Sequence, residues 1–574
     1  MPLLDAPAVA KLLVEIGQRL AFAGANPYKA RSYARAAQSL MALTVPLEEV
    51  VASGRLRELP GVGAALSKTI EELHRSGTTA SLERMRAEFP GSALELARVP
   101  GLAARKAVDL HRKLGIASLA ELEAACRDDR VAAAKGLGPA LQAKILQGIE
   151  LLRRSEGQRL IHHAEAFLNA TLANLAGSHP ELKRVVAAGD FRRGCELVRD
   201  LAVVAEAPAG GETHVLKPND DVRLWVAEAR RYGPALLAAT GSDAHVTGLQ
   251  EIAARKGFRL DGSGLFRNGR LVPCRTEEQA YRALGLSFVP PELREGRGEL
   301  ELAQEGPIAL VADGDLKGLL HCHTVFSDGG DTLEEMAEAT RRRGYGYFGV
   351  ADHSRSAGYA GGLSLEEIEE QHAEVDALNA RYGRKFRVLK GIESDILEDG
   401  SLDYPDEVLK TFDFVVASVH SRFRLDRRAQ TERMLRAVSN PYTTILGHMT
   451  GRMLLRRPGY DIDVEKVLAA CAKHRVAVEI NANPYRLDLD WRWHRRALEL
   501  GCLMSINPDA HSTDELDLTR WGVVMARKGG VPPERVLNCL PLEKLLGFLA
   551  DRRKRPPVRS RRTTRPRAAK ESRR

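Results

Sequence analysis

Between Leu316 and His511, short apolar runs end repeatedly in a histidine or a carboxylate. The runs are LKGLL before His321, YFGVA before Asp352 and His353, FRVLKGI before Glu393, FDFVVASV before His420, TTILG before His448, VAVEI before Asn481, and CLMSI before Asp509 and His511. Segments with helical periodicity, such as DTLEEMAEATRRRGY and YDIDVEKVLAACAKH, lie between them. The pattern predicts a strand, a polar loop and a helix repeated along this region, which is typical of a barrel of parallel strands.

Loops at the carboxyl ends of barrel strands converge on one mouth, so the polar residues that end these runs should meet there. They are six histidines and three carboxylates, namely His321, His323, Asp328, His353, Glu393, His420, His448, Asp509 and His511. At roughly three or four protein ligands per catalytic ion, this set suits two or three metals that share a bridging carboxylate. Mixed histidine and carboxylate donors favour zinc, manganese or iron over magnesium or calcium. A single histidine is more often structural, but a series at successive strand ends indicates a metal centre.

The N-terminal part of the chain has helical periodicity interrupted by glycine turns. Three segments place such a turn between amphipathic helices: RELPGVGAALSKTIEELHRSG around Gly61, Val62 and Gly63, ARVPGLAARKAVDLHRKLG around Gly101, and AAKGLGPALQAKILQGIE around Gly136 and Gly138. This helix-hairpin-helix pattern lets backbone N–H groups approach a DNA phosphate without reading bases. A purely structural helical hairpin is the alternative. Upstream, NPYKARSYARAAQSL gathers Lys29, Arg31 and Arg35 near tyrosines, which suits a nucleic-acid end.

Charge is concentrated at the C-terminal end. The chain of 574 residues has a formal net charge of +9, and residues 552–574 hold twelve Arg or Lys and one Glu, so the remainder is slightly acidic. Such a segment is expected to be a disordered basic arm, either solubilising or in contact with nucleic acid. The seven cysteines include no CxxC pair, and no apolar run reaches the length of a membrane span. We therefore expect a soluble, cytoplasmic, monomeric protein without a membrane partner.

The motifs HCHTVFSDG, ADHS, GIESDI, SVHS, GHMTGR, EINANP and NPDAHS resemble, in order and spacing, those of the PHP (polymerase and histidinol phosphatase) metallophosphoesterase domain. The resemblance implies a distorted barrel of seven strand-helix units with a multinuclear site. It assigns His321, His323, Glu393 and Asp509 to one ion, and Asp328, His353, His448 and His511 to a second. His420 would join Glu393 at a third. Asp352 is expected to fix the tautomer of a histidine ligand.

Catalysis at this centre is expected to involve Asp328, His353, His448 and Arg452. Clustered cations lower the pKa of a bound water to about 7 and offset charge on phosphoryl oxygens, so no covalent nucleophile is required. Arg452, Arg456 and Arg486 follow metal motifs and could bind the phosphates that flank the cleaved bond.

The segment from Arg159 to about Glu305 resembles the palm and thumb of a bacterial family X DNA polymerase, and the helical N-terminal part belongs to the same resemblance. The residues that carry it are AAGDFRRGCELVRDLAVVAEA, TGSDAHVTGLQEIAARKGF, TEEQAYRALGL and PPELREGRGELELA. Together with the metal barrel, the chain resembles the two-part bacterial enzyme of that family. The resemblance implies DNA as partner, with gapped, nicked or 3′-end substrates, and 3′–5′ exonuclease, 3′-end or abasic-site phosphodiesterase activity.

The resemblance to family X polymerases is incomplete at the positions of the catalytic carboxylates. Two-metal nucleotidyl transfer needs three carboxylates on neighbouring strands. The three corresponding positions of this sequence hold Asp200, Ala202 and Arg223, so only the first is a carboxylate. Asp220 and Asp221 lie close in sequence, but a one-residue slip on a strand turns a side chain to the opposite face. We therefore expect polymerase activity to be lost or very weak and Mg²⁺ binding at this site to be doubtful.

Two further features bear on the same site. Asp190 places a negative charge where the family binds the nucleotide triphosphate, whereas Arg192 and Arg193 remain as phosphate contacts or as anchors of a helix start.

The sequence thus predicts a multidomain α/β protein. The expected order is a helix-hairpin-helix domain (1–90), a second helix-hairpin-helix or fingers region (91–155), a degenerate nucleotidyltransferase-type α+β palm and thumb (156–305), a linker (306–315), the (β/α)7 PHP barrel (316–551) and the basic tail (552–574). The metals would be two or three Mn²⁺ or Zn²⁺ ions, with Fe²⁺ as an option. The alternative functions are a gap-filling DNA polymerase, a small-molecule PHP phosphatase and a non-catalytic DNA scaffold.

Overall fold

The computed structural model describes residues 3–23, 27–41, 43, 46–59, 61–208, 213–217 and 222–553. These residues form two compact units: residues 1–159, 163–185 and 455–457 make the first, and residues 160–162, 186–454 and 458–574 make the second. The basic tail and the pair Asp220 and Asp221 fall outside the described residues. Among the residues that are described, no helix is both long enough and apolar enough to cross a membrane.

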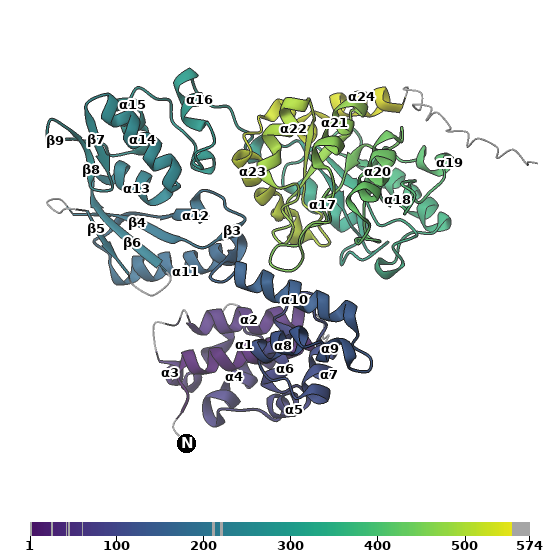
Figure 1. Ribbon diagram of the computed structural model, residues 1–574, viewed down its shortest axis with the longest axis horizontal. Helices are drawn as coiled ribbons and strands as arrows, with labels where there is room; N and C mark the ends of the chain where they lie inside the picture. Colours follow the sequence, from purple (N-terminus) through teal and green to yellow (C-terminus); the bar gives the residue numbers. More distant parts are fainter. Residues whose placement is uncertain are drawn as a thin grey trace, which may run out of the picture. The chain divides into compact units, whose positions relative to one another are not determined.

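The first unit is helical (Figure 1). Its elements are α1 (Ala6–Phe22), α2 (Pro27–Met41), α3 (Leu47–Ala52), η1 (Arg55–Glu58), α4 (Ala64–Ser76), α5 (Ala80–Glu88), α6 (Gly91–Ala97), α7 (Ala104–Leu114), α8 (Leu119–Arg127), α9 (Arg130–Ala133), α10 (Pro139–Arg154) and most of α11 (Ile161–Ser178). The side chains of Asp5, Thr79 and Ser118 accept from free N–H groups at helix starts. Gly77 and Gly115 end helices in the left-handed conformation that glycine adopts at low cost.

Each group of helices encloses its own apolar core. Val62, Leu66 and Ile70 pack with α1 and α2 in one core, whereas Leu102, Leu110 and Ile145 pack in a second core that contains α6–α10. The predicted glycine turns therefore join helices that are buried against each other on one side.

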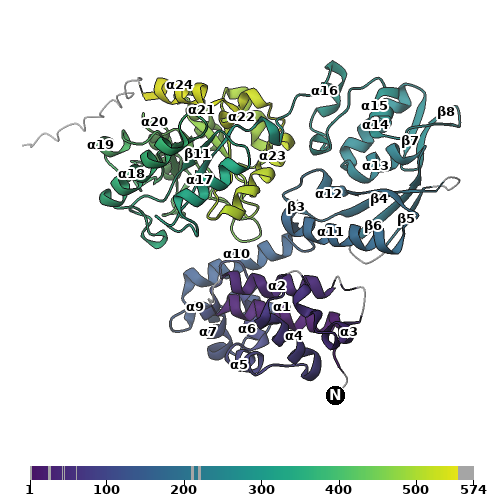
Figure 2. The same cartoon turned by 180° about the vertical axis from the view of Figure 1, so that it is seen from behind.

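The polymerase-like segment contains a mixed sheet and a small antiparallel sheet. Its strands are β1 (Arg159–Leu160), β2 (Lys183–Ala188), β3 (Leu197–Val198), β4 (Leu201–Ala207), β5 (His214–Leu216), β6 (Val222–Glu228), β7 (Phe258–Asp261), β8 (Gly264–Arg267) and β9 (Arg270–Val272). The larger sheet has the order β2-β4-β6-β5, in which β4 and β6 are parallel and β5 is antiparallel to β6. Figure 2 shows β4, β5 and β6 side by side. The helices are α12 (Gly189–Arg192), α13 (Tyr232–Thr240), α14 (Asp243–Arg255), α15 (Glu277–Ala283), η2 (Pro291–Leu293) and α16 (Glu299–Glu305).

The remaining residues form the predicted barrel. Its strands are β10 (Gly318–Cys322), β11 (Tyr347–Val350), β12 (Arg387–Leu389), β13 (Gly391–Asp395), β14 (Phe414–Ser418), β15 (Ile445–Leu446), β16 (Ala477–Asn481) and β17 (Met504–Asn507). They pair in parallel in the orders β10-β11-β12 and β13-β14-β15-β16-β17. Parallel bridges Cys322–Ala510 and His353–Glu393 link the two sheets. Because β12 and β13 are separated only by Lys390, they serve as one strand, and the ring contains the seven strand positions that the sequence predicts.

Except for η3, which precedes β10, the helices of this region follow the barrel strands in sequence. They are η3 (Asp313–Asp315), α17 (Leu333–Arg342), η4 (Gly358–Ala360), α18 (Leu365–Tyr382), α19 (Asp406–Leu409), α20 (Arg427–Ser439), α21 (Val464–His474), η5 (Trp491–Trp493), α22 (His494–Leu500), η6 (Thr513–Leu518), α23 (Thr519–Lys528), η7 (Pro533–Arg535), η8 (Leu537–Cys539) and α24 (Leu542–Arg553). Every residue of β10, β11, β13, β14, β16 and β17 is buried, as expected for strands covered on both faces. The strands read as near-continuous apolar runs for this reason.

Within the second unit, the polymerase-like segment and the barrel share buried contacts around Trp491. The indole Nε1 of Trp491 donates to Glu196 at 3.0 Å, and Arg492 pairs with the same carboxylate at 2.7 Å. The Lys528 ammonium lies 4.6 Å from the centre of the Trp491 ring and pairs with Glu295 at 2.5 Å. A charge removed from this region would leave its partner buried and unpaired, so these contacts tie the two parts together.

Asn538, on η8, is the side chain that seals the barrel between its first and last strands. Its amide nitrogen donates to Gly318 O at 3.2 Å and to Ile506 O at 2.6 Å, and its carbonyl accepts from Ile506 N at 3.0 Å. We expect Asn538→Ala to leave these buried backbone groups unpaired and to cost about 3 kcal/mol. For a domain of this size, that cost lowers the melting temperature of the barrel by about 6–12 °C.

The measurement is thermal unfolding followed by fluorescence. The matched control is Asn169→Ala, which alters an exposed position of α11. Equal melting temperatures for the two variants would contradict a sealing role for Asn538.

Candidate metal centre

The nine predicted donors lie together at the carboxyl ends of the barrel strands. Glu393, on β13, is at the centre of the group and is buried. Five imidazoles lie near its carboxylate oxygens: His353 Nδ1 at 3.0 Å, His448 Nε2 at 3.0 Å, His321 Nε2 at 3.2 Å, His420 Nε2 at 3.3 Å and His323 Nε2 at 3.7 Å. Glu393 therefore lies where one carboxylate is expected from the sequence to be shared between metal ions.

Two of the donors are held in unfavourable backbone conformations. His321 and Asp509 have φ values of 59° and 51°, in the left-handed region that side chains other than glycine rarely adopt. The strand pairing of β10 is irregular between Leu319 and Cys322, next to His321. Asp509 Oδ1 lies 3.7 Å from His321 Nε2 and 3.2 Å from His323 Nε2. Backbone strain of this kind persists where the surrounding structure enforces it, commonly at functional sites.

A second group of donors lies at the rim. Asp328 Oδ1 is 3.4 Å from His511 Nε2, 3.6 Å from His353 Nε2 and 3.9 Å from His323 Nδ1. The rings of His323 and His511 are stacked with their centres 4.2 Å apart. Asp328 is exposed, so this group faces the opening of the barrel.

The chemistry of the donors fits divalent metal ions. Several buried polar atoms in the described part of the chain have no hydrogen-bond partner here: His321 Nε2, both ring nitrogens of His323, His353 Nδ1 and both oxygens of Glu393. Buried groups of this kind are costly unless something binds them. Four combinations of the donors have ligand atoms within 4.8 Å of one another. The residues present can therefore hold more than one ion.

The predicted grouping of ligands is wrong for His448. The structure places His448 with His321 and Asp509, near Glu393, and the rim group contains His323 in its place. His448 follows β15, and its backbone N–H donates at 2.6 Å to Glu479 on the neighbouring strand β16, which also pairs with His321. The third predicted pair, His420 with Glu393, is present and also includes His353.

Two carboxylates that orient the histidines are absent from the sequence prediction. Glu479, inside β16, pairs with His321 Nδ1 at 2.5 Å and accepts from the His448 backbone N–H at 2.6 Å. Asp395, two residues beyond Glu393, pairs with His420 Nδ1 at 2.5 Å. Such contacts leave the other ring nitrogen, Nε2, turned toward a metal. The sequence did contain a signal for both residues, because a carboxylate within an otherwise apolar strand is unusual at a core position.

Asp352 does not orient a histidine, contrary to prediction. Its carboxylate accepts from Thr324 N and Oγ1, both at 2.7 Å, from Ser327 Oγ at 2.5 Å and from Gln371 Nε2 at 2.7 Å. Burial raises the pKa of Asp352 to about 6 despite these donors. Its role is to fix the loop that carries His323 and Asp328.

Arg452, predicted to bind phosphate, is committed to internal contacts. It pairs with Asp490 at 2.7 Å and donates to the backbone oxygens of Arg486, at 3.0 Å, and Leu487. Arg452 therefore holds the loop that follows β16. Arg486, on this loop, is partly exposed and lies nearer the metal ligands, with its Nε 3.5 Å from Asp509 Oδ2.

The electrostatics of the centre depend on paired opposite charges. Burial alone would lower the pKa of His420, but Glu393 and Asp395 raise it to about 10. Burial likewise opposes ionisation of His511, yet Asp328 and Asp509 raise its pKa to about 9. Burial would raise the pKa of Glu393, but the surrounding histidines hold it well below its usual range. In the absence of metal, protons on imidazoles therefore balance the carboxylates.

The polymerase-like site contains one carboxylate, and an arginine is paired with it. Ala202 on β4 lies opposite Arg223 on β6 in the parallel register. Arg223 binds Asp200 with both ends of its guanidinium, Nε at 3.0 Å and an Nη at 2.5 Å. The positions needed for two metal ions thus hold a carboxylate, a methyl group and a cation.

The neighbouring arginines are also engaged internally. Arg192 makes a two-point pair with Glu277 at 2.8 and 2.7 Å, and Arg193 pairs with Asp190 and Glu295 at 2.5 and 3.0 Å. Asp190, which the sequence predicts to place a negative charge at the triphosphate position, is paired here with Arg193. It also accepts from the backbone N–H groups of residues 199 and 200. Arg192 and Arg193 were expected either to contact phosphate or to anchor a helix start, and these contacts favour the structural role.

The hairpin residues lie at helix starts, as the predicted pattern requires. Gly61, with φ 77°, precedes α4, and a Cβ placed on it would lie 3.2 Å from Arg35 Cβ. Lys29 and Arg35 are exposed on α2, and the side chain of Arg31 lies outside the described part of the chain. The second and third hairpins adjoin each other, because Lys106 donates to Gly136 O at 2.7 Å and Lys144 lies against Gly101. Gly136 and Gly138 both have φ 82°.

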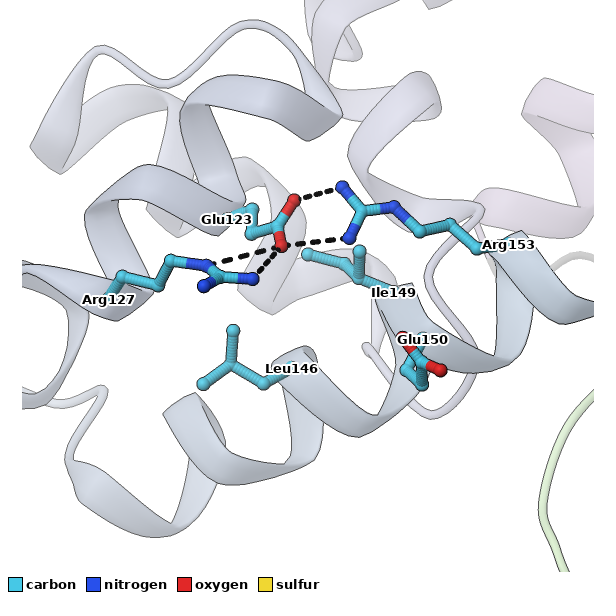
Figure 3. A pocket seen from close by; sticks show the side chains of 6 residues that line it. All are labelled: Glu123, Arg127, Leu146, Ile149, Glu150 and Arg153. Carbon is cyan, nitrogen blue, oxygen red and sulfur yellow. Dashed lines mark hydrogen bonds and ion pairs between the residues drawn. The ribbon is translucent and has the colours of Figure 1, made fainter.

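A pocket between α8 and α10 holds an ion-pair cluster (Figure 3). Glu123 pairs there with Arg127 at 2.6 Å and with Arg153, whose Nη donates at 2.9 Å. Hydrogen bonds from Arg153 and then Arg127 lower the pKa of Glu123. The guanidinium groups in the pocket are thus already neutralised by a carboxylate of the same chain.

Comparison with protein families matches three parts of the chain. A helix-hairpin-helix domain matches residues 5–79, a DNA polymerase beta thumb matches residues 235–295, and a PHP domain matches residues 320–483. The fold and the donor set thus define a protein in which a hairpin domain and a polymerase-type thumb precede a PHP metal barrel. This confirms the fold class expected from the sequence.

Curated relatives extend these matches. The DNA polymerase/3′-5′ exonuclease PolX of Bacillus subtilis is 33% identical over 94% of this chain and 98% of its own length. Probable phosphatases of Caldanaerobacter subterraneus and Escherichia coli are 27% and 26% identical over 41% of this chain, covering 91% and 94% of their own lengths. The chain belongs to the PolX family.

Metal uptake should release protons. His420 and His511, with pKa values raised to about 10 and 9, are protonated at pH 7, and a metal ion binds only the deprotonated imidazole. Because Glu479 and Glu393 also raise the pKa of His321 well above its usual range, we expect Mn²⁺ or Zn²⁺ binding to displace about three protons per chain at pH 7 and to weaken as the pH falls. Calorimetric titration in two buffers of different ionisation enthalpy measures the number of protons released per chain. Binding without proton release, and with equal affinity at pH 6 and 8, would contradict this electrostatic picture.

Proposed function

We propose that this chain is a metal-dependent phosphodiesterase that acts on DNA 3′ ends, as a 3′–5′ exonuclease or in the processing of 3′ or abasic ends. The observation that carries the proposal is the convergence of all nine donors around Glu393. The name of the Bacillus subtilis relative includes a 3′-5′ exonuclease activity, which supports the same assignment.

When bound, Mn²⁺, Zn²⁺ or Fe²⁺ ions in this centre would supply hydroxide near neutral pH and offset the charge that develops on the phosphoryl oxygens. Glu393 is suited to bridging two ions, and Asp328, His353 and His511 would hold the ion nearest the opening. Arg486 is suited to binding a phosphate oxygen, because it is partly exposed beside Asp509. Arg452 supports this by fixing the Arg486 backbone.

DNA is the substrate class that the other domains favour. The glycine turns at Gly61, Gly101 and Gly136 leave helix N-termini free to bind backbone phosphates without reading the sequence. Lys29 and Arg35 add positive charge on α2 near the first turn. The predicted domain boundaries, the monomeric state and a location in the bacterial cytoplasm remain predictions.

A small-molecule phosphatase is the second candidate. It is favoured by the probable phosphatases, which match 41% of this chain. Comparing turnover of a histidinol-phosphate-like ester with that of single-stranded DNA separates the two functions.

Removal of one inner ligand should abolish nuclease activity. We expect His323→Ala and Asp509→Asn to lower manganese-dependent shortening of 5′-labelled single-stranded, gapped and 3′-recessed DNA by at least about 100-fold. The matched control is His214→Ala, because His214 is an exposed histidine on β5. Unchanged hydrolysis by the ligand variants, with melting temperatures like that of the wild type, would refute the assignment.

Nucleotide addition is proposed to be absent or very weak. Asp200 is paired with Arg223, and no second carboxylate stands at position 202, so the two ions of nucleotidyl transfer lack ligands. We expect primer extension on gapped DNA with Mg²⁺ or Mn²⁺ to remain at background, in a His323→Ala background that prevents degradation of the product. Asp200→Ala should then change nothing. Robust template-directed addition that Asp200→Ala abolishes would establish the alternative, a gap-filling polymerase.

A further inference from the structure

Tyr359 is an exposed aromatic residue at the edge of the metal centre. It lies on η4, shortly after the ligand His353 in sequence, and 73% of its surface is exposed. Its ring centre is 6.2 Å from that of His353 and 6.5 Å from that of His420. Single exposed aromatic residues are common on protein surfaces, so it is the position of this ring beside two ligand histidines that points to a role.

The loop that carries Tyr359 is held firmly. Ala357 and Ala360 on either side are buried, and Ala360 N donates to Ala357 O at 2.8 Å. Leu363 N donates to His353 O at 2.9 Å, which ties the end of the loop to the ligand itself. A Cβ on Gly362 would lie 1.9 Å from Ser354 O, so only glycine permits this close approach. The ring is therefore presented from a fixed backbone.

The surroundings of Tyr359 are those of a substrate-binding edge. The ring lies beside two ligand histidines, and burial together with the nearby carboxylate of Asp395 raises the pKa of its hydroxyl group. The loop also borders the metal-ligand loop, because a Cβ on Gly361 would lie 3.5 Å from Ser327 O. Val325, on that second loop, is 51% exposed and adds apolar surface.

We propose that Tyr359 stacks on the base of the nucleotide whose phosphodiester is cleaved and so selects nucleic-acid ends over phosphoesters that lack a base. A phosphate bound at the metal centre has its sugar and base directed outward, where an exposed ring beside two ligand histidines can meet the base. Stacking on an aromatic side chain tolerates any base, which suits an end-trimming activity without sequence preference. The inference rests on the proposed phosphodiesterase function, and it makes Tyr359 a specificity residue rather than a metal ligand.

The experiment compares two 5′-labelled single-stranded DNAs that differ only at the 3′ end, where one has normal nucleotides and the other has tetrahydrofuran abasic residues. We expect Tyr359→Ala to lower kcat/KM on the normal end by about 5- to 100-fold, mainly through KM, and to leave the abasic end unchanged. Tyr359→Phe should behave like the wild type because the ring is kept. Leu546→Ala, at an exposed apolar position of α24, is the matched control and should change neither rate.

The outcomes separate the two levels of the proposal. A wild-type protein that cuts neither DNA contradicts the phosphodiesterase function itself. A wild-type protein that cuts both, with Tyr359→Ala lowering both equally or neither, contradicts the stacking role alone. Manganese titration of Tyr359→Ala should give the wild-type stoichiometry, and a lower stoichiometry would instead assign the residue to the metal centre.

Discussion

The buried carboxylate of Glu393 among five imidazoles is the interaction on which the barrel depends. An isolated charge in this position would be prohibitively costly, so the histidines must stay close whether they bind protons or metal ions. The five histidines come from the ends of four different strands, and closure of the strand ring is what brings them together. The left-handed backbones of His321 and Asp509 show that the barrel accepts local strain to maintain this arrangement.

In the polymerase-like segment, too, a carboxylate is paired with positive charge, but the charge there comes from an arginine. There, Arg223 supplies from within the chain the positive charge that metal ions would supply to carboxylates. A guanidinium bound at two points to Asp200 competes with any cation for the same oxygens. The barrel thus presents carboxylates among imidazoles that can exchange protons for metal ions, whereas Asp200 is already paired with a guanidinium.

The sequence predicts much of this arrangement, because the donors end apolar runs and parallel strands end on one side of a barrel. That reasoning finds all nine donors, and strand register finds Ala202 opposite Arg223. It does not find which donors are neighbours, since the place of His448 depends on loop paths that periodicity does not encode. Glu479 and Asp395 lie within strands, so a search for polar residues at strand ends does not identify them. The partners of Arg452 and Asp352 were also beyond reach, because long-range contacts decide whether a charged side chain is free or engaged.

The arginines of the polymerase-like segment suggest why this part of the fold persists without its carboxylates. Glu277 is buried between Arg192 and Arg294, and these two cations lower its pKa to about 2 although burial opposes the shift. Arg193 links Asp190 to Glu295, which in turn pairs with the barrel residue Lys528. These arginines thus hold the segment together and, through Glu295, join it to the barrel. Loss of any one of them would leave a buried partner charge, so the network is constrained by stability.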